Sequence, residues 1–510
     1  MLYTELLATW PLLGLLQLVP LLTGLLLIRI RGNGAFALAL GASTLEIILA
    51  ATLYFSFDNT QPAGVMQFAE HQPLFGAFHY HAAVDGMSVL FVLLTALLSF
   101  LGVVFILFRQ LHATSVLAVM MGVEATLLSQ FVTMDLLWFS LMSVLEILLV
   151  AYLTKRWPAS DDVIPAVVRF LQFMLVGLLL LMGGTLLLGW NYANISGTWS
   201  FSLYKLATVS VPEEMESVVF FMLFYGLAVR IPLFPFHGWL PDFLKFGNVA
   251  IAPMYLLGLK LGVYGLLRFV FPLLPNAVWT WHFVAVAFAV TGVFYAALLA
   301  LRQQNLRSLL AFAVVSHTSI LTIGLFSLDP LALQGSILLA LNFGLAISGL
   351  LFMTGLVWQR TRTTNLHRLG GMFDYIPMVG LAFFAAGLAI VGMPGTPGFN
   401  AVHFVLEGSI KTFGAPVTIA AAIGNLIAAG FLMRSFQRAF LSKPGGDTRH
   451  WNKQPSQLTE MVLAGTVIFV TVVVGFYDVP WLALIEEPVG GVGKLFDEFR
   501  GMSGVEAGHE

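Results

Sequence analysis

The sequence predicts an all-α integral membrane protein with about 14 transmembrane helices. The composition is 59% hydrophobic and only 10% charged, and the mean hydropathy is +0.90. Apolar runs of about 20 residues recur along the whole chain, and each is long enough to cross a hydrocarbon core of roughly 30 Å. The chain has no cysteine, which excludes disulfides and cysteine-ligated clusters. Its net charge of −2 argues against a nucleic-acid partner.

The expected spans follow one another with short polar connections. The first begins at the N-terminus, which lacks the basic n-region and the cleavage site of a signal peptide. The tail after residue 483 is expected to be interfacial or loose. The spans are expected near residues 2–28, 36–56, 83–108, 114–131, 134–154, 166–190, 216–236, 249–272, 281–301, 308–327, 331–358, 376–396, 399–435 and 460–482. With the N-terminus outside, most Lys and Arg residues fall on inside segments, which predicts that both termini are outside.

Two spans contain paired prolines that should break their helices. Pro232 and Pro235 lie late in the seventh span, and Pro394 and Pro397 lie in the twelfth. The twelfth span also includes the half-helix after Pro397, so the thirteenth begins near residue 415. Proline removes an amide donor, and the freed backbone groups must be buried in protein or line a watered cavity. Such prolines can also kink a membrane helix without any function. The breaks are an odd number of spans apart, so paired interruptions here favour an inverted-repeat transporter.

The predicted spans and breaks divide the chain into four parts. The N-terminal helices 1–3 occupy residues 1–110. The first inverted repeat, helices 4–8, occupies residues 111–275, and the second, helices 9–13, occupies residues 276–440. Residues 441–510 contain a linker, helix 14 and the C-terminal tail.

Several ionisable residues fall inside the predicted spans, where lipid would not tolerate them. A charge at the bilayer centre costs roughly 2.5–3.5 kcal/mol on insertion scales, so such groups face the interior, form pairs or change protonation state. A row of acids, bases and histidines at one depth suits a proton relay. The predicted proton pathway consists of Glu124, Glu146, Arg230, Lys260, His317, His403 and Glu407.

Each of these residues also has a purely structural interpretation. Glu146 could belong to a structural ion pair, and His317 could be a core histidine bonded to a serine. Glu46 lies in the second span and could simply bond locally. Asp135 is expected to be a helix cap, and His237 is expected to anchor the broken helix rather than carry protons.

Other chemistries have little support in the sequence. His79-Tyr80-His81 has no nearby carboxylate at metal-ligand spacing, so no metal site is expected. Gly183-Gly184 and Gly370-Gly371 lack the strand–loop–helix setting of a phosphate site. We therefore expect no cofactor and no catalytic residue.

The sequence resembles the antiporter-like membrane subunits of the complex I family, in particular the subunit M or chain 4 type. The resemblance covers about residues 80–485. The motifs that carry it are VDGMSVLFVLLTALL (84–98), LAVRIPLFPFHGWLPD (227–242), LGLKLGVYGLLRF (257–269), LRSLLAFAVVSHTSI (306–320) and GMPGTPGF (392–399).

The resemblance implies proton conduction along a mid-membrane polar axis in a bacterial inner membrane, with both termini periplasmic. Glu146 would be the key acid and Lys260 the central lysine. The implied partners are other membrane subunits and a soluble partner that drives or uses proton flow. The chain would then be part of an NADH:quinone oxidoreductase-type translocase without a catalytic site of its own.

The sequence departs from the family at two positions on this axis. Arg230 stands where the family usually has lysine, and arginine stays protonated in proteins. We interpret Arg230 as a fixed counter-charge for Glu146. Phe343 stands where a histidine is frequent. These departures leave two alternatives open: a proton-coupled inorganic-carbon uptake complex with a zinc carbonic-anhydrase-like partner, and a structural subunit that does not conduct.

Overall fold

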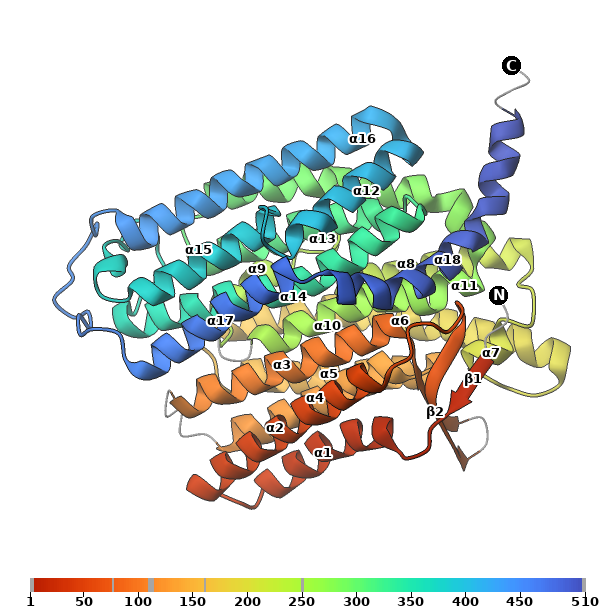
Figure 1. Cartoon of the computed structure of the whole chain (residues 1–510), viewed down its shortest axis with the longest axis horizontal. Helices are drawn as coiled ribbons and strands as arrows, with labels where there is room; N and C mark the ends of the chain where they lie inside the picture. Colours follow the sequence, from red (N-terminus) through yellow and green to blue (C-terminus); the bar gives the residue numbers. More distant parts are fainter. Residues whose placement is uncertain (1–3, 76–77, 109–113, 160–161, 249–251, 507–510) are drawn as a thin grey trace.

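The computed structural model describes residues 4–75, 78–108, 114–159, 162–248 and 252–506, and these form a helical bundle with a small β-sheet at one end (Figure 1). Within the described residues, eleven helices are long and apolar enough to cross a membrane. Two shorter apolar helices, Leu12–Leu27 and Pro377–Val391, accompany them. The predicted class, an all-α membrane protein, is confirmed. The expected count of about 14 spans stays a prediction.

The N-terminal part of the bundle carries the sheet. The strands are β1 (Thr4–Leu7), β2 (Val65–Phe75) and β3 (Phe78–Val84). β1 pairs in parallel with β2, and β2 pairs antiparallel with β3. The prediction that the first span begins at residue 2 is wrong, because residues 4–7 pair with β2 and the first helix begins at Leu12.

The first half of the chain continues with helices on both sides of the first predicted break. These helices are α1 (Leu12–Leu27), α2 (Asn33–Ser56), α3 (Gly86–Phe108), α4 (Thr114–Val132), α5 (Leu136–Arg156), α6 (Val163–Ser196), α7 (Leu203–Leu206), α8 (Glu213–Arg230), α9 (Leu240–Phe246) and α10 (Ala252–Gly265). A π-helical turn, Leu266–Val270, extends α10.

The second half repeats this pattern of long helices around a break. Its helices are α11 (Phe271–Leu273), α12 (Pro275–Arg302), α13 (Leu306–Leu325), α14 (Pro330–Thr361), α15 (Pro377–Val391), α16 (Gly398–Phe436), α17 (Leu458–Phe476) and α18 (Val479–Glu506). A 3₁₀ turn, Met372–Asp374, precedes α15, and a π-helical turn, Gln437–Leu441, follows α16.

The helices are interrupted at both proline pairs. α8 ends at Arg230, and residues 231–239 form turns before α9 begins. α15 ends at Val391, and residues 392–397 are non-helical before α16. α16 contains a further kink at Gly414, whose φ of 70° favours glycine. From α4 onward and from α12 onward, three long helices precede the interrupted helix, with the short α7 as an addition in the first half.

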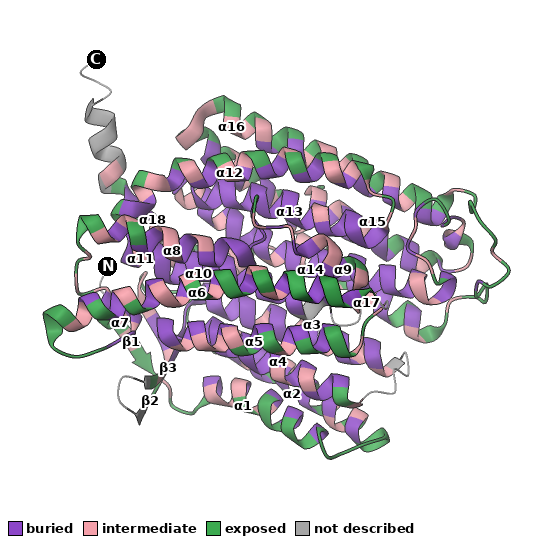
Figure 2. Ribbon diagram, turned by 180° about the vertical axis from the view of Figure 1, so that it is seen from behind, coloured by how far each residue is buried: buried purple, intermediate pink, exposed green. Residues whose placement is uncertain are grey.

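Three helices form the centre of the bundle. In α10, α13 and α14, 94% of the most apolar window is buried inside the protein, compared with 33% in α6 and 28% in α16 and α17. Figure 2 shows this contrast as continuously buried ribbons at the centre and mixed burial on the outer helices. Helices that are buried on every side are apolar all round, so a charged residue on them stands out.

The C-terminal segment is expected to be interfacial or loose, and the structure shows that it is not loose. Residues 479–506 form α18, whose Ile485 and Phe496 are fully buried. The backbone of α18 packs so closely on Gly86 that a Cβ at that position would overlap the carbonyl of Leu484. β1 and the C-terminal end of α18 lie at the same end of the bundle (Figure 1).

Candidate functional site

A buried ion pair joins two of the predicted residues. Glu146 on α5 and Arg230 at the end of α8 are each only 3% exposed, and their side chains form a salt bridge. The Arg230 guanidinium also donates to the hydroxyl of Ser143 at 2.6 Å and to the amide oxygen of Gln130 at 3.2 Å. Ser143 in turn donates to Gln130 at 2.7 Å. The pair is thus held inside a polar network contributed by α4, α5 and α8, as a buried charge requires.

The ion pair lies directly against the central helix α10. A Cβ added at Gly258 would overlap the Glu146 carboxylate and would lie 3.7 Å from the guanidinium of Arg230. Only glycine leaves room for the carboxylate at this position. Lys260 follows two residues later on the same helix, so α10 carries both the glycine against which the carboxylate packs and the buried lysine.

Lys260 and His317 share a small cavity at the centre of the bundle. The cavity has a volume of about 10 Å³, and its lining includes Lys260 from α10, His317 from α13 and Phe343 from α14. This is about the space that one water needs. Lys260 Nζ lies 5.6 Å from the centre of the Phe343 ring, and the His317 ring lies 4.9 Å from it, edge to face.

His317 has one satisfied and one free ring nitrogen. Its Nδ1 lies 2.9 Å from the carbonyl oxygen of Ala313, one turn earlier on α13. Its Nε2 has no hydrogen-bond partner among the described residues, and the side chain is 1% exposed. The structural alternative of a serine partner does not hold, because His317 bonds to its own helix backbone.

Two further acids lie together on the N-terminal side of the bundle. Glu124 on α4 and Glu46 on α2 are both fully buried, and they are close enough for their charges to interact. Neither carboxylate oxygen of Glu46 has a hydrogen-bond partner among the described residues. A lone acid in a span can bond locally, but the carboxylate of Glu46 makes no such bond within the described part of the chain.

The structure places the last two predicted residues elsewhere. His403 and Glu407 lie on the outer face of α16, with side chains that are 63% and 43% exposed. Glu407 lies 3.6 Å from His403 and 3.3 Å from Lys411, so the three residues form a ladder along one helix. They do not join the buried row, because the outer face of α16 points away from the central helices.

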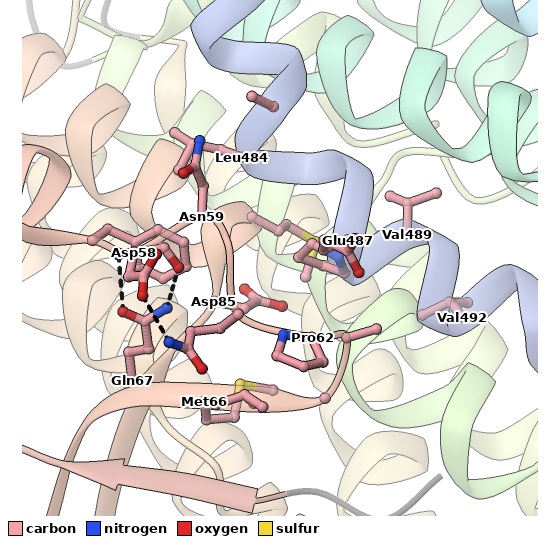
Figure 3. Close-up of a pocket in the computed structure, with 18 of the residues that line it drawn as sticks. Asp58, Asn59, Pro62, Met66, Gln67, Asp85, Leu484, Glu487, Val489 and Val492 are labelled. Carbon is pink, nitrogen blue, oxygen red and sulfur yellow. Dashed lines mark hydrogen bonds between the residues drawn. The ribbon is translucent and has the colours of Figure 1, made fainter.

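Asp85 and Arg268 form a buried ion pair at the sheet end of the bundle. Asp85 accepts from the amide of Ser88 at 2.9 Å, which caps α3, and forms a 2.6 Å ion pair with the buried Arg268. Both residues line a pocket of about 50 Å³ between the segment before β2 and α18, where Gln67 bonds to the backbone of Asp58 (Figure 3). The VDG motif therefore fixes the joint between α3, α10 and α18.

Asp135 and His237 lie in the connections between helices. Asp135 accepts from the amide of Trp138 at 2.8 Å and caps α5 as expected. Burial raises the pKa of Asp135 to about 6, against the opposing backbone hydrogen bonds. His237 lies in the break after α8, where its ring packs on Phe234 and Tyr295.

The expectation that no carboxylate approaches the histidines of β3 is wrong. Glu5 contacts His81 at 2.7 Å and His71 at 2.5 Å. These residues are far apart in the sequence, and the pairing of β1, β2 and β3 brings them together. Burial raises the pKa of Glu5, but hydrogen bonds from His81 and His71 outweigh it and lower this pKa to about 2.

Sequence reasoning missed the polar residues that hold the ion pair. Gln130 and Ser143 are uncharged and common in membrane helices, so only their approach to Arg230 identifies them. Ser143 does lie one turn before Glu146, which places both on one face of α5. That spacing was the one available signal.

The fold and the buried charged row define a polytopic helical membrane protein with interrupted helices and ionisable groups at its centre. The chain belongs to the family described as NADH:quinone oxidoreductase/Mrp antiporter, transmembrane, which matches residues 113–428. It is 28% identical over 477 residues to NADH-quinone oxidoreductase subunit M of Escherichia coli strain K12, covering 89% of this chain and 91% of that protein.

Solved structures agree with this assignment. A chain of respiratory complex I from Thermus thermophilus is similar with a TM-score of 0.85 and 25% identity, covering 95% of this chain and 99% of that one. A chain of the Mrp complex from Dietzia sp. DQ12-45-1b has a TM-score of 0.84 at 18% identity, covering 96% and 98%, which shows the shared fold. The predicted resemblance to the complex I family is confirmed.

Proposed function

We propose that this chain conducts protons across the membrane as a subunit of a larger complex of the complex I type. The observation that carries the proposal is the buried row of Glu146, Arg230, Lys260 and His317, each 3% exposed or less, on four adjoining elements of the bundle. Ionisable groups buried inside a membrane protein mark ion pathways more often than scaffolds.

The four residues have different roles in this proposal. Arg230 stays charged and holds the Glu146 carboxylate in place, because a guanidinium does not lose its proton in a protein. Lys260 and His317 exchange protons through water in the cavity that they share, since both side chains can lose a proton. Phe343 lines the same cavity, which leaves room for about one water and limits the exchange to it. Glu124, together with Glu46, leads into the row from the N-terminal side.

We propose that the two interruptions are the hinges of half-channels. Pro232 and Pro235 lie directly after Arg230, so a shift of this break would move the guanidinium. Pro394 and Pro397 occupy the corresponding place in the second half. The common order of elements supports inverted repeats over residues 111–275 and 276–440. His403 and Glu407, on the outer face, would serve as an exit toward a neighbouring subunit.

We place the chain in a bacterial inner membrane with both termini periplasmic. β1 and the end of α18 lie at one end of the bundle (Figure 1), which supports termini on the same side of the membrane. The distribution of Lys and Arg supports the periplasm as that side. Its partners would be other antiporter-like membrane subunits and a soluble partner that drives or uses proton flow. The relatives are named as subunits of NADH-quinone oxidoreductase, which does not favour inorganic-carbon uptake or a purely structural subunit.

The test is proton flux through the full-length protein in liposomes. A potassium gradient with valinomycin sets the voltage, and a trapped pH-sensitive dye reports proton entry. Glu146→Gln and Lys260→Met should each reduce flux at least tenfold, because each removes a titratable group from the row.

Two variants at exposed positions are matched controls. Glu213→Gln and Lys205→Met make the same chemical changes at exposed residues, and both should conduct as the wild type does. Wild-type flux no greater than that of protein-free liposomes would overturn the proposal, and so would unchanged flux in both variants of the row.

A further inference from the structure

Three side chains with metal-ligating atoms converge at the sheet end of the molecule. Glu5 on β1, His71 on β2 and His81 on β3 place their ligand atoms within 4.8 Å of one another. The Glu5 carboxylate uses one oxygen for each histidine, at 2.5 Å to His71 Nε2 and 2.7 Å to His81 Nε2. None of these residues belongs to the proposed proton pathway.

The fold fixes this arrangement on three strands. His71 and His81 are direct partners in the antiparallel ladder, and their rings lie 4.0 Å apart. Cross-strand partners of this kind project from the same face of a sheet. β1 pairs in parallel with β2 and brings the Glu5 carboxylate to the two imidazoles. The site therefore exists only when all three strands are paired.

His81 is held more firmly than the other two residues. Its carbonyl accepts from the amide of Met134 at 2.9 Å, and its ring stacks on Tyr204 with centres 4.9 Å apart. Its second ring nitrogen, Nδ1, lies 3.5 Å from the hydroxyl of Ser202. A metal-ligating histidine commonly has such a partner on its other nitrogen, which fixes the ring orientation. The His71 side chain is 46% exposed and leaves the site open to solvent.

We propose that Glu5, His71 and His81 form a binding site for a divalent transition-metal ion, with Zn²⁺ as the natural occupant. Two imidazoles and one carboxylate are a common zinc ligand set, and they leave a fourth position for water or a further ligand. Bonds of about 2.0–2.2 Å in a tetrahedron separate ligand atoms by roughly 3.4 Å. Small rotations of the exposed His71 and of Glu5 would open the present contacts to that spacing.

The ion would fasten the N-terminal strand to the hairpin. β1 has only four residues, so its hydrogen bonds alone hold it weakly. An ion ligated by all three strands binds the folded sheet and not the unfolded chain, so it stabilises the sheet by mass action. This role is independent of proton conduction, and either proposal can fail without the other.

The test is Zn²⁺ binding to the full-length protein in detergent after treatment with EDTA. Calorimetric titration should give one site per chain in the wild type. Glu5→Gln, His71→Gln and His81→Gln should each weaken binding at least tenfold, and His450→Gln, which changes an exposed histidine outside the sheet, should bind as the wild type does. Co²⁺ is the spectroscopic probe, because tetrahedral ligation gives intense visible absorption bands.

A melting curve with and without Zn²⁺ separates loss of the site from loss of the fold. Variants that are folded without metal but show no rise in Tm with Zn²⁺ support the proposal. A wild type that binds no Zn²⁺ above the background of the triple variant overturns it, and so does unchanged affinity in all three single variants. Because His71 is exposed, His71→Gln should fold. This variant decides the test if Glu5→Gln and His81→Gln fail to fold.

Discussion

The replacement of Arg230 by methionine tests whether this residue is a fixed counter-charge. The change keeps an apolar chain of similar length in the bundle but removes the guanidinium. That group makes an ion pair with Glu146 and hydrogen bonds to Ser143 and Gln130. The carboxylate would then be 3% exposed without its charged partner.

The expected cost follows from this burial. Removal of one partner from a buried ion pair costs about 3–5 kcal/mol, because the remaining charge is uncompensated. Glu146→Gln leaves the guanidinium uncompensated and should cost a similar amount. The double variant leaves neither charge uncompensated. Its loss of stability should therefore be smaller than the sum of the two single losses by about 2 kcal/mol or more.

The assay is a double-mutant cycle on the full-length protein. Equilibrium unfolding in mixed micelles with increasing SDS gives the free energy of unfolding, followed by far-UV circular dichroism. Arg169 and Asp242 provide the matched control, since their 2.5 Å ion pair has side chains that are 53% and 39% exposed. The cycle Arg169→Met with Asp242→Asn should give a coupling of only about 0–1 kcal/mol.

Additive costs at Glu146 and Arg230, with a coupling no larger than that of the exposed pair, would refute the reasoning. Arg230→Lys supplies a second check. A lysine has no planar fork, so it cannot serve Glu146, Ser143 and Gln130 with the same geometry. We expect Arg230→Lys to retain folding with reduced stability and to change the pH dependence of proton flux, since lysine can lose its proton.

Three further outcomes are expected. Gly258→Ala should destabilise the protein by about 1–3 kcal/mol, because a Cβ overlaps the buried carboxylate. Gly387→Ala should not destabilise it, because a Cβ at this position meets nothing within 4 Å. Equal free energies of unfolding for the two variants would contradict this prediction. Phe343→His adds a titratable group to the cavity that Lys260 and His317 share and should raise liposome proton flux at least twofold, so a flux at or below the wild-type value counts against the proposed path. Burial raises the pKa of Asp135 to about 6 from its ordinary value of 3.8. Between these values the folded chain keeps a proton that the unfolded chain releases. The free energy of unfolding therefore falls as the pH rises from about 4 to 6. Asp135→Asn should remove this pH-dependent loss of stability. Parallel curves of Tm against pH for the variant and the wild type would exclude a contribution from Asp135.

The residues that sequence reasoning located correctly are those whose physics is local. A lysine or glutamate in an apolar run is costly wherever its helix lies, so burial of Lys260 and Glu146 in the interior followed from the run itself. The interruptions at Pro232 and Pro394 likewise follow from the missing amide and the steric clash within one helix. The same reasoning fails for His403, because the face that a residue presents depends on how α16 packs.

The sequence by itself determined the helical membrane architecture, the two interrupted helices and the identity of the central charged residues. Only the tertiary structure decided which side chains meet. Ser143 and Gln130 hold Arg230, Phe343 lines the cavity that Lys260 and His317 share, and Glu5 reaches two histidines that lie more than sixty residues away. Hydropathy and proline act on a single segment, whereas these contacts depend on the packing of segments distant in the chain, which no local pattern records.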